Sequence, residues 1–203
     1  MLREALVPVK PATMARCGIV SRWPSILYGH AMQKLAAIEI REGQPSSEAL
    51  DVVAQALRAE GIIVAGYLQR NLSQQAGLIS DTVLEDIETG EQFGIMQALG
   101  ASATSCRLDT GALADIAART LVRLERPADI LILNRFGNAE AEGHGLRAAL
   151  EMAMDRDIPV MTLVEPAYLQ AWRDYVGDMA ASLAPVTADA LAWYHSLTSA
   201  ATR

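Results

Sequence analysis

The chain has 203 residues, a formal net charge of −7 and a hydrophobic fraction of 51%, which is enough apolar material for a substantial core. Its acidity argues against nucleic acid as a partner, and the absence of any run of about 18 apolar residues argues against a membrane span. Two cysteines are too few for a disulfide framework or a thiolate metal site, so we expect a cytoplasmic protein without a metal centre.

The beginning of the chain differs from the remainder. Residues 1–34 hold five basic residues and one acidic residue, although the whole chain is acidic. Pro8, Pro11 and Pro24 interrupt any helix in this stretch. We expect residues 1–33 to form a disordered basic extension, with a basic docking arm as the alternative, and residues 34–203 to form a single α/β domain.

The next stretch predicts a βαβ unit. Leu35–Ile40 and Ile62–Tyr67 are apolar runs of strand length. Between them, apolar residues recur at helical spacing as far as Glu60, and Ser46 or Ser47 stands where a helix cap is expected. The two strands and the helix between them are therefore expected to form a βαβ unit.

A hairpin interrupts this parallel layout. Thr82–Ile87 and Gln92–Met96 have strand character and flank a short turn that contains glycine. A helix follows, with Asp109 or Thr110 as its cap and Pro127 beyond its end.

The best-defined segment lies in the second half of the chain. Ile130–Leu133 is apolar without alternation, which is typical of a strand buried on both faces in the middle of a parallel sheet. A helix at Leu146–Met154 and a buried strand at Ile158–Val164 follow, and Ala167–Met179 and Thr187–Leu197 are predicted to be helical. The whole pattern predicts an α/β fold with a mostly parallel sheet, helices on both faces and an inserted antiparallel ribbon.

Open sheets of this kind bind ligands outside the carboxyl ends of their strands. Arg70, Arg107 and Arg135 lie just after predicted strands or in loops near their ends, and a guanidinium group binds oxyanions through two hydrogen bonds. We take them as candidate anion contacts, with three solvated surface arginines as the alternative.

Two further candidates follow the central strand. Asn134 occupies the position where a hydrolase of this layout places an acidic magnesium ligand, and an amide binds a metal ion less strongly than a carboxylate. Glu140 is a candidate general base, although a carboxylate near a helix start is also favoured by the helix dipole alone.

The turn Arg41–Ser47 stands where a phosphate-binding loop is expected. It contains one glycine and no lysine, and Pro45 removes an amide donor. Ser46 and Ser47 offer hydroxyl groups beside a helix N-terminus, either as ligand contacts or only as caps. This turn argues against nucleotide hydrolysis by the usual mechanism.

Several motifs have a familiar order. They are Ala65–Asn71, Leu84–Gly90, Cys106–Asp109, Leu131–Gly137 with Glu140–Gly143, and Tyr168–Trp172. From Leu35 to about Val186 the chain resembles a bacterial family of unknown function whose members are often named as ATP-binding proteins of molybdenum transport.

More distantly, the order of elements resembles the small P-loop nucleoside-triphosphatases. In those proteins a strand-ending Asp-Glu-Ile-Gly followed by a glutamate corresponds to Asn134–Gly137 and Glu140. The two resemblances imply a P-loop-like fold, ATP, GTP or molybdate as the ligand, and association with components of molybdate transport.

We therefore interpret the chain as a non-hydrolytic, cytoplasmic binding protein for a small anion, either a nucleotide or an oxyanion, linked to molybdenum homeostasis. One alternative is a nucleoside-triphosphate hydrolase with an atypical phosphate site. Another is a regulatory or interaction module without a ligand. Each alternative is compatible with a homo-oligomer.

Overall fold

The computed structural model of the protein describes residues 33–40, 48–71, 82–97 and 108–201. The predicted N-terminal extension, apart from Gln33, lies outside these residues. The helices and strands follow one another in the order β1 (Leu35–Glu39), α1 (Glu48–Ala59), β2 (Val64–Asn71), β3 (Thr82–Asp86), β4 (Gln92–Gly94), α2 (Thr110–Leu124), β5 (Ile130–Phe136), α3 (Asn138–Ala141), α4 (Arg147–Asp155), β6 (Val160–Val164), η1 (Pro166–Tyr168), α5 (Leu169–Val176), η2 (Gly177–Met179), β7 (Ala180–Leu183) and α6 (Thr187–Ala201).

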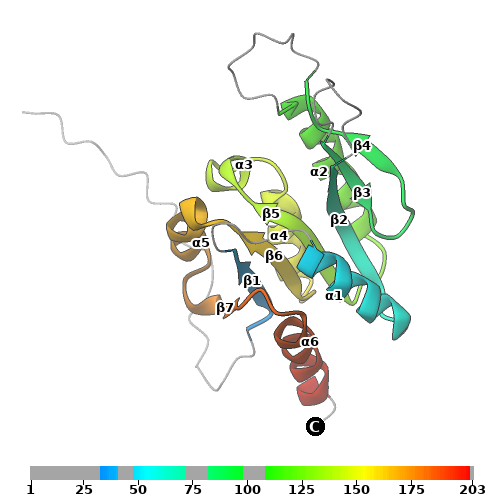
Figure 1. The fold of residues 1–203 in the computed structure, drawn as a ribbon, viewed down its shortest axis with the longest axis vertical. Coiled ribbons are helices and arrows are strands. Elements are labelled where there is room, and N and C mark those ends of the chain that lie inside the picture. The colour runs from blue at the N-terminus through cyan, green and yellow to red at the C-terminus, as the bar shows by residue number, and fades with distance from the viewer. Residues whose placement is uncertain (1–32, 41–47, 72–81, 98–107, 202–203) are drawn as a thin grey trace, which may run out of the picture. The chain divides into compact units, whose positions relative to one another are not determined.

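The strands form one seven-stranded sheet in the order β4-β3-β2-β5-β6-β1-β7 (Figure 1). The five strands from β2 to β7 in this order are parallel, whereas β3 and β4 are antiparallel and extend the sheet beyond β2. The predicted mostly parallel sheet with an inserted antiparallel ribbon is confirmed.

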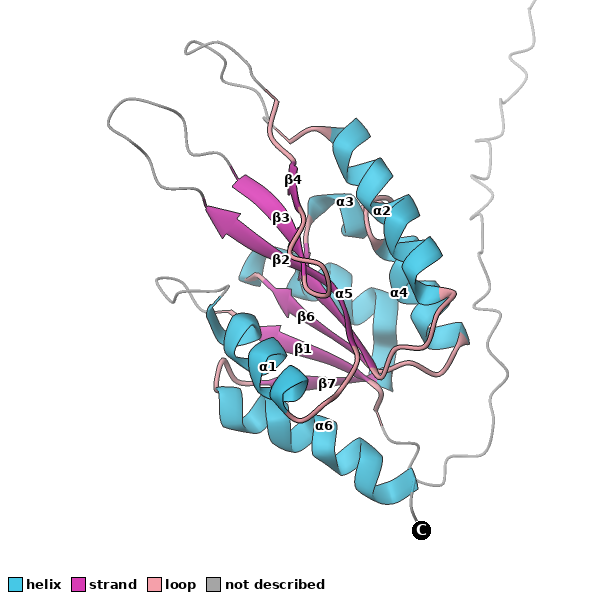
Figure 2. Ribbon diagram, turned by 90° about the vertical axis from the view of Figure 1, so that its right-hand side faces the viewer, coloured by secondary structure: helices cyan, strands magenta, loops and turns pink. Residues whose placement is uncertain are grey.

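Helices cover both faces of the sheet, as predicted (Figure 2). Helices α1 and α6 pack on one face, and α2, α4 and α5 pack on the other. The side chains of β5 alternate between the two cores: Ile130 and Ile132 face α1 and α6, and Leu131 and Leu133 face the opposite layer. Because β5 is buried on both faces, its sequence shows no alternation of polar and apolar residues.

Local signals set the ends of several helices. Asp109 caps α2, and its Oδ1 accepts hydrogen bonds from the backbone N–H of Gly111 at 2.9 Å and of Ala112 at 3.0 Å. Gly61 follows α1 with a φ of +82°, the left-handed conformation that glycine adopts without strain. The cap at Asp109 agrees with the prediction from the sequence.

The structure differs from the prediction in several places. The strands β1 and β2 share the sheet but are not neighbours, because β5 and β6 lie between them. The strand β5 continues through Asn134 and Arg135 to Phe136 instead of ending at Leu133. Helix α3 and strand β7 were not predicted, since four residues are too few for a periodic pattern to stand out.

The contact between β2 and β5 changes at Gly66. The ladder pairs Val64 with Ile130, Ala65 with Leu131 and Gly66 with Ile132, and then ends. Gly66 has a φ of +121°, and a Cβ atom there would lie 1.9 Å from the carbonyl oxygen of Ile132. Only glycine allows this approach, so Gly66 fixes the point at which β2 parts from β5.

We expect Gly66→Ala to lower the free energy of unfolding by about 3 kcal/mol or more, because the new methyl group would overlap the backbone of β5. Gly90→Ala is the matched control: Gly90 also has a positive φ, of +74°, but no atom lies within 4 Å of the added Cβ. Backbone strain alone should cost about 1–2 kcal/mol there. Equal losses for the two variants in urea unfolding would contradict the close approach.

Candidate functional site

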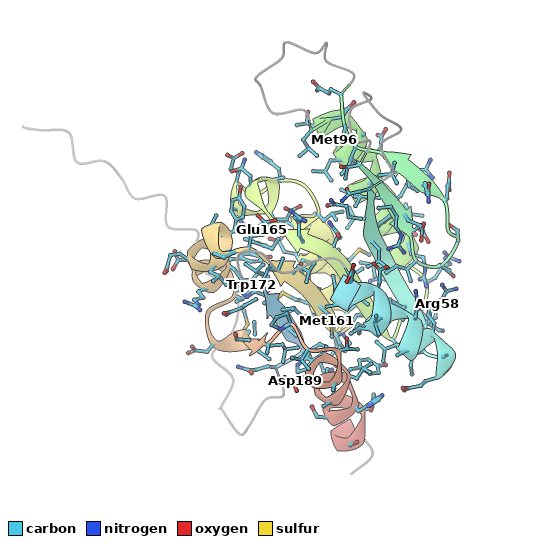
Figure 3. The ribbon with its side chains drawn as sticks, viewed as in Figure 1. Arg58, Met96, Met161, Glu165, Trp172 and Asp189 are labelled. Carbon is cyan, nitrogen blue, oxygen red and sulfur yellow. The ribbon has the colours of Figure 1, made fainter. Side chains whose placement is uncertain are left out.

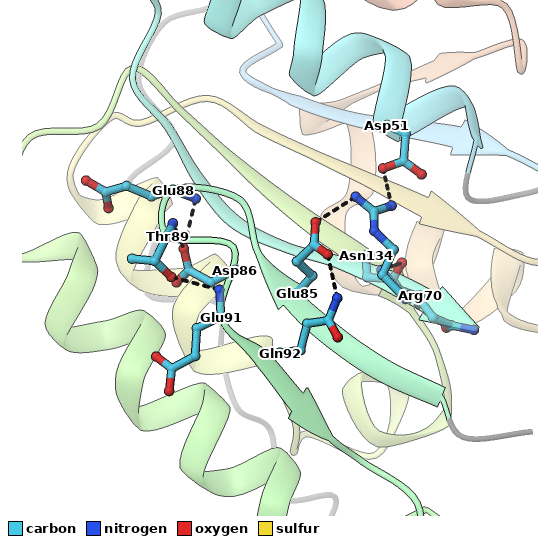
Figure 4. Close-up of polar contacts among 10 residues, drawn as sticks. Asp51, Arg70, Glu85, Asp86, Glu88, Thr89, Glu91, Gln92 and Asn134 are labelled. Carbon is cyan, nitrogen blue, oxygen red and sulfur yellow. Dashed lines mark hydrogen bonds and ion pairs between the residues drawn. The ribbon is translucent and has the colours of Figure 1, made fainter. Parts of the chain in front are cut away.

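Arg70 lies within β2 and is held by two carboxylates (Figure 4). Its guanidinium group donates to Asp51 of α1, and its Nη2 donates to Oε1 of Glu85 on β3 at 2.9 Å. The hydrogen bond to Glu85 is the largest contribution that raises the pKa of Arg70. The same bond, followed by one from Gln92, lowers the pKa of Glu85. Arg70 therefore joins α1 to the ribbon, and an external anion would have to displace a carboxylate to reach it.

Beyond Gly66, where the backbone ladder between β2 and β5 ends, the side chain of Asn134 connects the two strands. Its Oδ1 accepts a hydrogen bond from the backbone N–H of Gln69 at 3.1 Å, and its Nδ2 donates to the Oε1 of Gln69 at 3.1 Å. The residue is 5% exposed. Both ends of the amide are thus engaged in holding β2, which accounts for a polar residue within a buried strand.

Glu140 of α3 closes the loop that follows β5. Its Oε2 accepts from the backbone N–H of Gly137, and its Oε1 accepts from the backbone N–H of Leu146, both at 3.0 Å. The residue is 6% exposed, and a Cβ at Gly145 would lie 2.3 Å from its Oε1. The carboxylate therefore has a structural role in this loop, and the general-base role stays a prediction.

Arg135 pairs with a residue that the sequence analysis did not select. The Nη1 of Arg135 donates to Oε1 of Glu165, which directly follows β6. Both side chains are about a third exposed. The Nε of Arg135 is shielded from solvent and has no hydrogen-bond partner within the described part of the chain. Only part of this guanidinium group is engaged.

A second polar group lies at the same edge of the sheet. Oε1 of Glu39, the last residue of β1, accepts from Oγ of Ser182 on β7 at 2.7 Å and from Nη2 of Arg173 on α5 at 3.3 Å. Glu39 and Ser182 also line a hollow of about 450 Å³ at the ends of β1 and β7. Its lining consists of Glu39, Ile40, Pro166, Leu169, Ser182, Leu183, Ala184 and Pro185.

The two groups form a row along the carboxyl edge. The strands β5, β6, β1 and β7 are consecutive in the sheet, and Arg135, Glu165, Glu39 and Ser182 lie at or just beyond their carboxyl ends. Figure 3 shows Glu165 at the edge where α3 and α5 also lie. This is the edge at which open α/β sheets bind ligands.

The row includes residues that were predicted and residues that were missed. Glu39 ends one buried apolar strand and Glu165 directly follows another, so the rule that selected Arg135 could have found both. Arg173 and Ser182 carried no such signal, since one lies on a helix and the other on a strand that was not predicted.

Three of the predicted candidates, Arg107, Ser46 and Ser47, lie outside the described residues, as does the turn Arg41–Ser47. Across residues 33–40, 48–71, 82–97 and 108–201, no three histidine, cysteine, aspartate or glutamate residues are grouped so that they could hold a metal ion. Within the same ranges, no helix has the length and apolar character needed to span a membrane.

Comparison with known proteins identifies the family. Residues 35–193 match the family described as "Protein of unknown function (DUF2478)". The chain belongs to this family. The family match therefore covers every described strand and every helix before α6, and it ends within α6.

One curated protein similar to the chain is the "Molybdenum import ATP-binding protein ModC 2" of Bradyrhizobium diazoefficiens, with 32% identity over 150 residues. The match covers 74% of this chain but only 17% of that protein. No solved structure matches the chain significantly. Together with the sheet order and the two helix layers, the similarity supports a P-loop-NTPase-like α/β fold for this DUF2478 protein.

We expect Asn134→Leu to lower the free energy of unfolding by about 1–3 kcal/mol, because it leaves the N–H of Gln69 without its acceptor. Gln69→Met is the matched comparison, since it removes the bond between the two side chains and keeps the one to the backbone. Gln69→Met should therefore lower the free energy of unfolding by less than Asn134→Leu does. A wild-type unfolding midpoint for Asn134→Leu would show that this amide does not hold β2 to β5.

Proposed function

We propose that the protein is a non-hydrolytic, cytoplasmic binding protein for a small anion, a nucleotide or an oxyanion, and that it is linked to molybdenum homeostasis. The observation that carries the proposal is the partly engaged guanidinium group of Arg135 at the carboxyl edge. Its Nη1 pairs with Glu165, while its Nε is shielded from solvent and has no partner among the described residues.

The chemistry of this guanidinium group suits an oxyanion. A phosphate-like group presents several oxygens and can accept from Nε and Nη together, whereas the pair with Glu165 uses Nη1. A buried donor without a partner costs free energy, so an anion that satisfies Nε, once the Arg135 side chain rotates to expose it, gains that contribution on binding. Arg173 lies at the same edge, where it donates to Glu39.

The proposal excludes hydrolysis because the residues expected to support it have other roles. Asn134 uses both ends of its amide to hold Gln69, and it is neutral where a magnesium ligand would be acidic. Glu140 accepts a backbone hydrogen bond on each of its oxygens. A general base needs an oxygen that can approach the attacking water, so the arrangement favours binding without turnover.

The proposed link to molybdenum comes from the similar protein of Bradyrhizobium diazoefficiens. Its name assigns it to molybdenum import and ATP binding, and the similar segment is 17% of its length. The activity for which that protein is named can therefore lie outside the similar segment. We propose an association of this chain with components of molybdate transport, in which the chain supplies ligand binding.

A ligand-free regulatory module is the second candidate, and the internal ion pairs favour it. Arg70 is held by Asp51 and Glu85, and Arg135 is held by Glu165, so the protein neutralises these cations itself. A protein that has lost its ligand could keep such pairs for stability alone. Binding measurements separate this candidate from the first.

We expect isothermal titration of the full chain with ATP, GTP, inorganic phosphate and molybdate to detect binding of at least one of them. Arg135→Ala should weaken that binding about ten- to a hundredfold, which corresponds to the loss of one charge-assisted contact. The control is Arg58→Ala in the last turn of α1, well separated from Glu165 (Figure 3). Equal affinities for the wild type and the folded Arg135→Ala variant would reject the site, and no binding of any ligand would favour the ligand-free module.

We also expect no release of phosphate from ATP or GTP above background with magnesium. The reasons are the neutral amide of Asn134 and the engaged carboxylate of Glu140. Turnover near 1 s⁻¹, roughly the low end for ordinary enzymes, would contradict the proposal if it disappeared in Glu140→Gln. That result would favour the nucleoside-triphosphate hydrolase.

A further inference from the structure

The proposed anion site contains a carboxylate as well as a guanidinium group. Oε1 of Glu165 accepts from Nη1 of Arg135, and both side chains are about a third exposed. An anion that reaches Arg135 therefore approaches an acidic side chain at the same time. This juxtaposition restricts which anions fit.

The backbone of Glu165 is fixed, so the carboxylate can move only by rotation of its side chain. Glu165 is the N-cap residue of η1, and its carbonyl oxygen accepts a hydrogen bond from the N–H of Tyr168 at 2.9 Å. Pro166 follows, and its ring locks the backbone at the next position. On the neighbouring strand β1, the carboxylate of Glu39 disfavours movement of a second negative charge toward it.

An ionised carboxylate accepts hydrogen bonds and cannot donate them. An oxyanion without a proton would therefore face Glu165 with lone pairs and like charge, which is unfavourable. An oxyanion that carries an O–H group can donate a hydrogen bond from this group to Glu165. Its other oxygens can accept hydrogen bonds from Arg135. At neutral pH inorganic phosphate keeps such a proton, whereas sulfate and molybdate have none.

We propose that Glu165 determines the specificity of the site by selecting protonated oxyanions, of which hydrogen phosphate is the simplest, against sulfate and molybdate. The inference rests on the proposed function and specifies the ligand class of the same site. It separates the link to molybdenum from direct binding of molybdate at Arg135. Selection arises because an oxyanion without a proton is repelled by Glu165 and offers it no hydrogen bond.

The test is isothermal titration of the full chain with inorganic phosphate, sulfate and molybdate at neutral pH. We expect the wild type to bind phosphate at least about tenfold more tightly than the other two, the equivalent of one hydrogen bond. Glu165→Gln should remove most of this preference, because an amide of the same size can donate to an oxyanion that has no proton. The control is Glu60→Gln, which removes the carboxylate that follows the C-terminal end of α1 and pairs with His195. This variant should keep the preference for phosphate.

Any other outcome contradicts the proposed role of Glu165. The variants then show whether the proposed function is contradicted as well. If Arg135→Ala weakens phosphate binding while Glu165→Gln leaves the preference unchanged, the site stands and the role of Glu165 is wrong. If Glu165→Gln tightens all three anions equally, Glu165 is only a competing charge. If the wild type binds none of the three anions, the role of Glu165 is wrong, and the proposed function then depends on whether ATP or GTP binds.

Discussion

The burial of β5 on both faces is the constraint on which the rest of the structure depends. Ile130 and Ile132 pack into one core, and Leu131 and Leu133 pack into the other. A strand in this position can carry polar chemistry only where it leaves the core, at its end. Asn134 and Arg135 mark that point. At the same edge, Glu165 directly follows β6, which lies beside β5, and Glu39 ends β1, which lies beside β6.

The polar groups at this edge divide into two kinds. Asn134 and Glu140 maintain the fold, because one carries the contact between β2 and β5 past Gly66 and the other closes the loop after β5. Arg135 and Glu165 form a partly exposed pair, and the buried Nε of Arg135 has no hydrogen-bond partner among the residues that the structure describes. This division separates the side chains that maintain the fold from the pair that forms the proposed anion site.

The sequence predicted the sheet class and most elements because burial leaves a direct pattern. Ile130–Leu133 indicated a central strand, and Asp109 indicated the start of α2. The contacts at the site could not be predicted in the same way. The partner of Arg70 on α1 lies 19 residues away in sequence, and that of Arg135 lies 30 residues away. Such pairs follow from the strand order, which places β6 beside β5 and separates β1 from β2.

The most direct test of the account observes the guanidinium group of Arg135 itself. Because its Nε–H is shielded from solvent, its proton should exchange slowly enough to give a resolved signal in a ¹H–¹⁵N NMR spectrum of the full chain. Loss of the signal in Arg135→Lys assigns it. The account predicts that this signal shifts progressively on titration with inorganic phosphate, while the Nε–H signal of Arg70 does not. An unchanged Arg135 signal at saturating phosphate would contradict the account.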